Sequence, residues 1–261
     1  HPQFPELRPQ IYNHEAMPYE GCILGYFTVW QGPENNVCDS LNIQKRNEVL
    51  IGWSKDGFHW NRENKKPFLP VSEDFHAWNA GNVQSTAGSP LIVGDSLYFY
   101  VSGRYNSKPK HDSNFATGLA MLRRDGFVSM RAGRKEGYVE IKTKIPANGN
   151  YLFVNADVKG TLAVEVLDDN GQPMEGFTKK DCISMKKSDK TKQMISWEKH
   201  PGVTSLVGKT VRLKFYLNQA DIYAFWISAW QTGESGGYTG GGGPGLSDKG
   251  IDTPMDKLKN N

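Results

Sequence analysis

The segment 49–60 limits the possible folds more than any other part of the sequence, because it contains a complete unit of β-sheet structure. Its opening apolar run, Val-Leu-Ile-Gly-Trp, predicts a buried strand. Asp56 and Gly57 then predict a tight turn, since glycine adopts a positive φ at no steric cost and a short carboxylate bonds nearby backbone N–H groups. Phe58 and Trp60 follow at the spacing that places two side chains on one face of the next strand. The segment therefore predicts a β-hairpin in which Asp56 has a structural role.

Strand patterns recur through the first half of the chain. Residues 88–103 contain an apolar strand, a turn at Gly94-Asp95, and a second strand that is largely apolar on both faces. Such a strand is expected where a sheet packs between two neighbours. Strand-rich units cover residues 18–60 and 80–124, close to the length of about 40–50 residues that is usual for a propeller blade. Residues 1–124 are therefore predicted to form propeller blades.

The pattern changes after this region. Residues 125–232 contain short alternating strands separated by turns, and Asp168-Asp-Asn-Gly171 is a strong hairpin signal. Separate strands are expected at residues 138–142, 151–156, 162–167, 211–217 and 222–227. This arrangement predicts a β-sandwich. Residues 233–261 are rich in glycine and lysine, which predicts a flexible tail or a strand-like arm held by its neighbours. The predicted fold class is all-β.

Composition and charge narrow the function classes. The chain is 38% hydrophobic and 11% aromatic with 28 glycines, which suits a soluble, turn-rich β protein. No apolar run approaches the roughly 20 residues of a membrane-spanning helix, so no membrane association is expected. The net charge is only +3, but lysines gather at residues 179–192, as either a site for an anionic glycan or a solvated loop face. No nucleic-acid-binding signature accompanies them, so no nucleic-acid partner is expected.

The sequence predicts no cofactor and no metal site. It has no P-loop, dinucleotide fingerprint, Gly-x-Ser-x-Gly elbow or His-x-x-x-His cluster. Cys22, Cys38 and Cys182 match no zinc motif and cannot all pair, while a bridge between the first two stays open because sequence does not give the geometry. The chain starts at His1 without a signal peptide, so we expect a mature or excised piece of a secreted or periplasmic protein.

Several motifs together resemble bacterial proteins grouped with glycoside hydrolase family 32, relatives of the five-bladed propeller glycosidases of families 32, 43 and 68. The turn at residues 54–60 is also similar to a sialidase Asp box shortened by one residue. The motifs are Ile11-Tyr-Asn, Pro18-Tyr-Glu-Gly, Ser54-Lys-Asp-Gly-Phe-His-Trp, Gly94-Asp-Ser-Leu-Tyr-Phe-Tyr, Arg124-Asp-Gly-Phe, Leu152-Phe-Val-Asn-Ala-Asp, Val164-Glu-Val-Leu-Asp and Ile222-Tyr-Ala-Phe-Trp. The resemblance implies a five-bladed type of propeller followed by a β-sandwich.

The chain departs from that family in length. Five blades need about 200–300 residues before the sandwich, and residues 1–124 suffice for only part of them. The resemblance therefore implies the C-terminal part of a propeller, with the missing blades on a second chain or removed. Because the family takes its nucleophile or base from the first blade, the chain alone is not expected to be a competent glycosidase.

Glu20 is the candidate catalytic residue. Glycoside hydrolysis needs two carboxylates on either side of the scissile bond, and the resemblance places Glu20 near the family's general acid. The Glu-Cys-Pro signature of fructosidases is absent here, and an ion pair or a turn-capping role is the alternative for Glu20. Glu15 is a poorer candidate for the same role.

His14, Tyr19, Trp78 and Arg104 are the candidate substrate-binding residues, at or beside predicted strand ends and loops, where binding groups concentrate. An exposed Trp78 would stack on the apolar face of a sugar ring, and its alternative is packing against an adjoining blade. Arg104 would bind a carboxylate or sulfate with two hydrogen bonds, and its alternative is a salt bridge between blades.

Two functions from different classes fit these observations. The first is part of a glycoside hydrolase that acts on a polysaccharide or oligosaccharide by carboxylate acid/base chemistry in the propeller pocket. The second is a non-catalytic glycan-binding or adhesive scaffold module. Carbohydrate is the expected partner in both cases.

Overall fold

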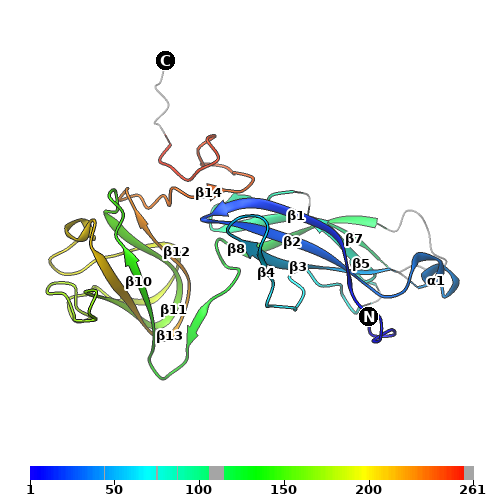
Figure 1. Ribbon diagram of the computed structural model, residues 1–261, viewed down its shortest axis with the longest axis horizontal. Coiled ribbons are helices and arrows are strands. Elements are labelled where there is room, and N and C mark those ends of the chain that lie inside the picture. The colour runs from blue at the N-terminus through cyan, green and yellow to red at the C-terminus, as the bar shows by residue number, and fades with distance from the viewer. Residues whose placement is uncertain (44, 75, 87, 106–114, 256–261) are drawn as a thin grey trace, which may run out of the picture. The chain divides into compact units, whose positions relative to one another are not determined.

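The computed structural model describes residues 1–43, 45–74, 76–86, 88–105 and 115–255, and these form an all-β protein (Figure 1). Its described helices are the short α1 (Asn35–Ser40) and the 3-10 turn η1 (Thr204–Leu206). Neither is long and apolar enough to cross a membrane. The all-β class is therefore confirmed, while the propeller and the sandwich stay predictions.

The chain divides into two compact units that separate in sequence after Met121. Among the described residues, unit 1 comprises 1–121 with the later segments 237–244 and 248–250, and unit 2 comprises 122–236, 245–247 and 251–255. Each unit is described by itself below.

Unit 1 contains two antiparallel sheets. The first has the order β14-β1-β2-β3-β4, and the second has β5 and β6 on one edge of β7 and β8 on the other. The strands of the first sheet are β1 (Gln10–Glu20), β2 (Cys22–Gln31), β3 (Arg46–Ser54), β4 (Trp60–Asn61) and β14 (Tyr238–Thr239). Those of the second are β5 (Asn82–Thr86), β6 (Leu91–Val93), β7 (Ser96–Arg104) and β8 (Phe115–Arg123).

The β3–β4 hairpin has the predicted turn. Asp56 Oδ1 accepts hydrogen bonds from the backbone N–H groups of Phe58 and His59, both at 2.9 Å. The structural role of Asp56 is confirmed. Because these bonds keep residues 58 and 59 in the turn, Phe58 does not share a strand face with Trp60, and its side chain is 87% exposed. Trp60 is half-buried and donates from Nε1 to the carbonyl of Gly57 at 3.0 Å.

The predicted turn at Gly94-Asp95 is also confirmed. Val93 pairs with Ser96, so the turn residues form a two-residue connection, and Gly94 has a φ of 58°. The strand that follows packs its inner face against the first sheet, where Tyr26 and Phe99 meet edge to face at 5.8 Å. Burial of such aromatic pairs stabilises unit 1.

Unit 2 is built on one curled five-stranded sheet, with the order β10-β13-β11-β12 and β9 paired to β13. Its strands are β9 (Met130–Ala132), β10 (Gly137–Lys144), β11 (Tyr151–Leu167), β12 (Met185–Ile195) and β13 (Thr210–Ser228). The sheet curls around an apolar core that includes Val154, Val164, Leu213, Phe215 and Trp197.

The strands of unit 2 are longer than the sequence pattern suggested. The expected separate strands at residues 151–156 and 162–167 form the single strand β11, and those at 211–217 and 222–227 form β13. Irregular register between Val158 and Thr161 lets β11 bend without ending. The predicted turn after β11 is present, since Asp168 Oδ1 accepts from the N–H groups of Asn170 and Gln172, but the chain returning from it forms only an isolated bridge between Leu167 and Pro173.

Part of the glycine-rich segment lies against unit 1. Tyr238 and Thr239 pair with Glu20 and Tyr19 as β14, and the carbonyl of Gly242 accepts a hydrogen bond from the N–H of Ile92 at 2.8 Å. Gly243 lies so close to the Ile92 carbonyl that a Cβ there would overlap it. This part of the chain is an arm held by its neighbours. Cys22, Cys38 and Cys182 form no disulfide with one another.

Asp56 should make the stability of the hairpin depend on pH. Hydrogen bonds from the N–H and the ring of His59, and from the N–H of Phe58, hold the pKa of this carboxyl well below its ordinary value. A carboxyl whose pKa is lower in the folded than in the unfolded state stabilises the fold while it is ionised. This stability is fully present above the unfolded-state pKa of about 3.9 and is lost as pH falls toward the folded-state pKa. Asp56→Ala should therefore lower the thermal midpoint of unit 1 by more at pH 7 than at pH 2.5. Asp248→Ala, at an exposed aspartate outside the hairpin, is the control, and equal losses at both pH values would contradict the assignment.

Candidate functional site

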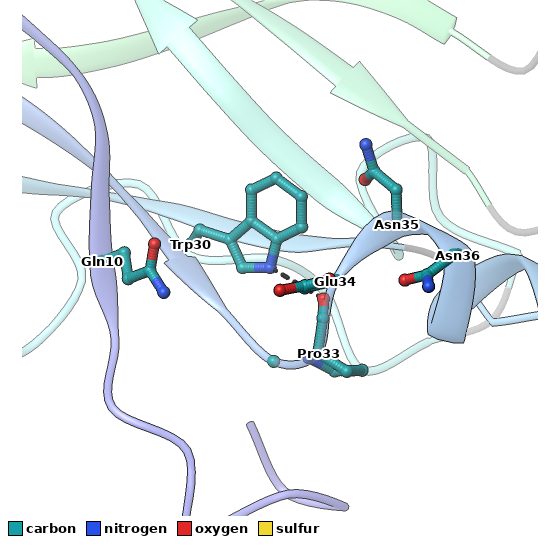
Figure 2. Close-up of a pocket in the computed structure, with 7 residues that line it drawn as sticks. Gln10, Trp30, Pro33, Glu34, Asn35 and Asn36 are labelled. Carbon is teal, nitrogen blue, oxygen red and sulfur yellow. Dashed lines mark hydrogen bonds between the residues drawn. The ribbon is translucent and has the colours of Figure 1, made fainter.

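A cleft of about 430 Å³ lies at the end of β2 in unit 1, and we call it the Trp30 cleft (Figure 2). Figure 2 shows the indole of Trp30 between the side chain of Gln10 and the start of α1, where Glu34, Asn35 and Asn36 lie. The lining residues are Gln10, Trp30, Gly32, Pro33, Glu34, Asn35 and Asn36.

Strand pairing and a tight turn place these groups together. Gln10 at the start of β1 pairs directly with Trp30 at the end of β2. Gly32 then takes a φ of 128°, which glycine allows and other residues resist, and the chain turns into α1. The carbonyl of Pro33 accepts a hydrogen bond from Trp30 Nε1 at 3.2 Å, so the indole is held in one orientation.

Tyr12 and Lys45 extend the aromatic surface around Trp30. The register of β1 against β2 shifts between Ile11 and Asn13, so Tyr12 is a bulged residue, and bulges redirect side chains next to sites. Its ring centroid lies 5.8 Å from that of Trp30 and the ring is 47% exposed. The Lys45 ammonium lies 5.1 Å from the centroid of the indole, within range of a cation–π contact.

The chemistry of the Trp30 cleft is that of a binding site for a polar ring compound. An aromatic face packs against an apolar surface, while Gln10, Asn35 and Asn36 supply amide donors and acceptors. Glu34 occupies the N-cap position of α1 but its side chain makes no cap hydrogen bond. Among the described residues that line the cleft Glu34 is the one carboxylate, so these residues do not form the pair that glycoside hydrolysis requires.

His14 lies on the outer face of the first sheet in an aromatic and cationic cluster. Its ring stacks on Phe27 at 4.2 Å and meets Trp60 edge-on at 4.5 Å. The Arg62 guanidinium carbon lies 4.6 Å from the centroid of the Phe27 ring. Burial lowers the pKa of His14, and the charge of Arg62 lowers it further, although Glu15 opposes both. The imidazole is therefore held toward its neutral form.

Tyr19 and Glu20 lie at the turn between β1 and β2. Tyr19 is only 3% exposed and pairs with Thr239 of the arm, so its ring belongs to the packed interior of unit 1. Glu20 has a φ of 48° in the turn, and its carboxylate is close to Gly237, where a Cβ would overlap it. Glu20 does not line the Trp30 cleft.

Trp78 and Arg104 lie together at one end of the second sheet. The indole of Trp78 lies on the backbone of Gly103 in β7 and Gly118 in β8, where any Cβ would overlap the ring, and it is 37% exposed. Arg104 is the last residue of β7, pairs with Asn82 of β5, and has an exposed side chain. The structure thus brings these two predicted residues together but leaves Glu20 outside their group.

Sequence reasoning did not select the residues of the Trp30 cleft. The signal was present, since an aromatic strand ends at Trp30 and Gly32-Pro33 breaks it before a run of Glu and Asn. The contribution of Gln10 could be known only from the pairing register of β1 and β2.

Unit 2 has two further cavities. One, of about 480 Å³, includes His200 stacked on Phe177 at 4.2 Å, so the aromatic face of Phe177 is covered. The other, of about 350 Å³, is lined mainly by charged side chains of β11 and β12. Across the part of the chain that the structure describes, no three His, Cys, Asp or Glu side chains are grouped to hold a metal ion.

Comparison with known proteins gives little further information. The sequence matches no known protein family and no curated protein. A solved structure from Parabacteroides distasonis ATCC 8503, provisionally named a glycoside hydrolase, aligns with 66% of this chain at 13% sequence identity and a TM-score of 0.30. The alignment spans 54% of that protein's length. Similarity at this level does not establish a shared family, and the resemblance to family 32 rests on sequence motifs alone.

The cluster around His14 predicts that any side chain at position 25 destabilises unit 1. A Cβ at this position would lie 2.8 Å from His14 Nε2 and 2.9 Å from Phe27 Cε2, and it would overlap the indole of Trp60. Gly25→Ala should therefore destabilise unit 1 by about 1–3 kcal/mol, as overpacking does, measured by urea denaturation. Gly21→Ala is the matched control, because no atom lies within 4 Å of its added Cβ. A Gly25→Ala protein as stable as Gly21→Ala would show that the cluster is loosely packed.

Proposed function

We propose that this chain is the carbohydrate-binding part of a carbohydrate-active protein, and that a sugar binds in the Trp30 cleft. The observation that carries the proposal is the fixed indole of Trp30 beside three side-chain amides and one carboxylate in a cleft of about 430 Å³. Sugar rings have an apolar face that packs on an aromatic ring and a rim of hydroxyl groups that amides and carboxylates bond. The volume is within the range of about 300–1,000 Å³ for small-molecule sites.

The fold supports the same proposal in a more detailed form. We propose that the two sheets of unit 1 are blades of a partial propeller of the five-bladed type, and that unit 2 is a β-sandwich formed by one sheet folded on itself. The hairpin motif at residues 54–60 and the face-to-face packing of the unit 1 sheets at Tyr26 and Phe99 support the first part. The long curled strands β11 and β13 support the second. Under this proposal a second chain supplies the remaining blades, and the protein is secreted or periplasmic.

Binding and catalysis are separate parts of the proposal. Binding needs only the Trp30 cleft and holds for a glycoside hydrolase and for a non-catalytic glycan-binding module alike. Catalysis needs a second carboxylate about 5–10 Å from Glu20, which the proposal assigns to the missing blades.

Replacement of Trp30 tests the binding function. Trp30→Ala removes the aromatic face and should weaken binding by about tenfold or more, since loss of such packing costs about 1–2 kcal/mol. Affinity is measured by isothermal titration calorimetry with the oligosaccharides selected by wild-type protein on an array of neutral and acidic glycans.

Trp53→Ala is the matched control, because this tryptophan is 45% exposed on the same sheet but outside the cleft. Equal losses in the two variants, or unchanged affinity of Trp30→Ala, would contradict the assignment of the cleft. A wild-type protein that binds no glycan on the array would contradict the proposed function itself.

The role of Glu20 as general acid stays a prediction. In the protein assembled with its missing blades, Glu20→Gln should keep sugar binding and lower turnover by about 10²–10⁴, the usual contribution of a positioned acid. Glu63→Gln, at an exposed glutamate in the same unit, is the control. Full turnover of Glu20→Gln would end the catalytic assignment and leave the binding proposal intact.

A further inference from the structure

We infer that the binding surface continues from the Trp30 cleft to Trp78 and Arg104, and that its ligand is an anionic oligosaccharide whose acidic groups bind Lys45 and Arg104. The inference rests on the proposed function, because it names the class of sugar that the same site takes. It is argued from contacts within unit 1 alone.

A chain of contacts connects the two tryptophans. Lys45 lies over the indole of Trp30, and its carbonyl accepts a hydrogen bond from Asn82 Nδ2 at 3.2 Å. Asn82 pairs with Arg104 between β5 and β7, and the carbonyl of Arg104 accepts from the N–H of Gly81 at 2.9 Å. Trp78 packs on Gly103, the residue before Arg104. All these groups therefore lie at the same end of the two sheets, the end where Figure 1 also shows α1.

Trp78 provides a second aromatic surface for the ligand. The six-membered part of its indole lies against two glycine backbones, so the sheet covers part of the ring, and the residue is 37% exposed. Sheets that pack face to face lie about 10 Å apart. Because Trp30 is on one sheet and Trp78 packs on the other, a ligand that contacts both indoles is longer than one sugar unit.

The charges at this end of unit 1 select an anionic ligand. Lys45 and Arg104 have no acidic partner among the residues that the structure describes. The neighbouring Arg46, in contrast, is paired with Glu48 and Glu73. Cations without a partner attract carboxylate and sulfate groups, and the arginine fork bonds either with two parallel hydrogen bonds.

Glu34 determines which part of the ligand enters the Trp30 cleft. A carboxylate in the cleft repels an acidic substituent, so an uncharged part of the sugar packs on Trp30. The acidic substituents then lie between the two indoles, next to Lys45 and Arg104. This arrangement predicts that the site recognises where the acidic groups lie along the oligosaccharide as well as their charge. A dispersed lysine surface would not distinguish these positions.

The test compares three hexasaccharide probes by titration calorimetry with the full chain. The probes are an oligogalacturonate, the same oligosaccharide with its carboxylates reduced to alcohols, and a sulfated heparin-derived fragment. Wild-type protein should bind the oligogalacturonate or the sulfated probe about tenfold more tightly than the reduced one, as charge-assisted hydrogen bonds allow. The preference should decrease as salt is raised from about 0.05 to 0.5 M.

Substitutions then locate the preference. Arg104→Gln and Lys45→Gln should each reduce it severalfold without changing affinity for the reduced probe, whereas Trp78→Ala should weaken all binding. Lys55→Gln is the matched control, since this exposed lysine bonds the carbonyl of Gly21 at the opposite end of β2. Circular dichroism and the thermal midpoint check that each variant folds.

The outcomes separate this inference from the proposed function. A preference for the sulfated probe alone or for the uronate alone supports the anionic class and identifies the acidic group. Equal affinity for charged and reduced probes, or a preference that persists in both cation variants, overturns the inference while binding that requires Trp30 survives. Failure of all three probes to bind overturns the inference, whereas the proposed function falls only when no glycan on the array binds.

Discussion

Unit 1 depends on close contact between aromatic rings and the backbone of strand glycines. Trp60 and Phe27 fill the space above Gly25, and Trp78 lies across Gly103 and Gly118. Glycine in a strand weakens it by its conformational freedom in the unfolded chain, so its presence here needs a compensating contact. The large rings provide that contact, because they approach the backbone more closely than any Cβ would allow. Contacts of this kind hold Trp60 in the β3–β4 hairpin, and they hold Trp78, the second indole of the proposed ligand surface.

The turns of this protein could be predicted from sequence because their chemistry is local. Asp56-Gly57 and the Asp168 turn each carry a side-chain hydrogen-bond acceptor and a positive-φ glycine within a few residues, and the Gly94-Asp95 turn carries a positive-φ glycine. Strand length could not be predicted in the same way. A β-bulge lets β11 continue where the alternation of the sequence suggests an end, and the pairing of β14 with β1 joins segments more than 200 residues apart.

The candidate site was only partly accessible to sequence reasoning for the same reason. Residue type and position at a strand end selected Trp78 and Arg104, and the structure places them together. Sequence reasoning could not select the Trp30 cleft. Gln10 lies beside the indole only because of the pairing register of β1 and β2, and Tyr12 lies near it because of a bulge in β1. Tyr19 shows the same dependence on distant parts of the chain, since an aromatic residue near a turn is expected to be accessible but is here 3% exposed and paired with Thr239 of the arm.

The proposed ligand surface is held by strand ends, and this determines what its polar groups contribute. Asn82 is buried, and an amide in that position costs free energy unless it is bonded. Its Nδ2 bonds the carbonyl of Lys45, so the amide fixes the main chain of the residue whose ammonium lies over Trp30. An apolar side chain would fill the same space without this effect. Groups that are fixed before the ligand arrives lose less conformational entropy on binding. The Oδ1 of Asn82 has no hydrogen-bond partner among the residues that the structure describes, so the buried amide is better explained by the position it gives to Lys45, a cation of the proposed site, than by the stability of the sheet.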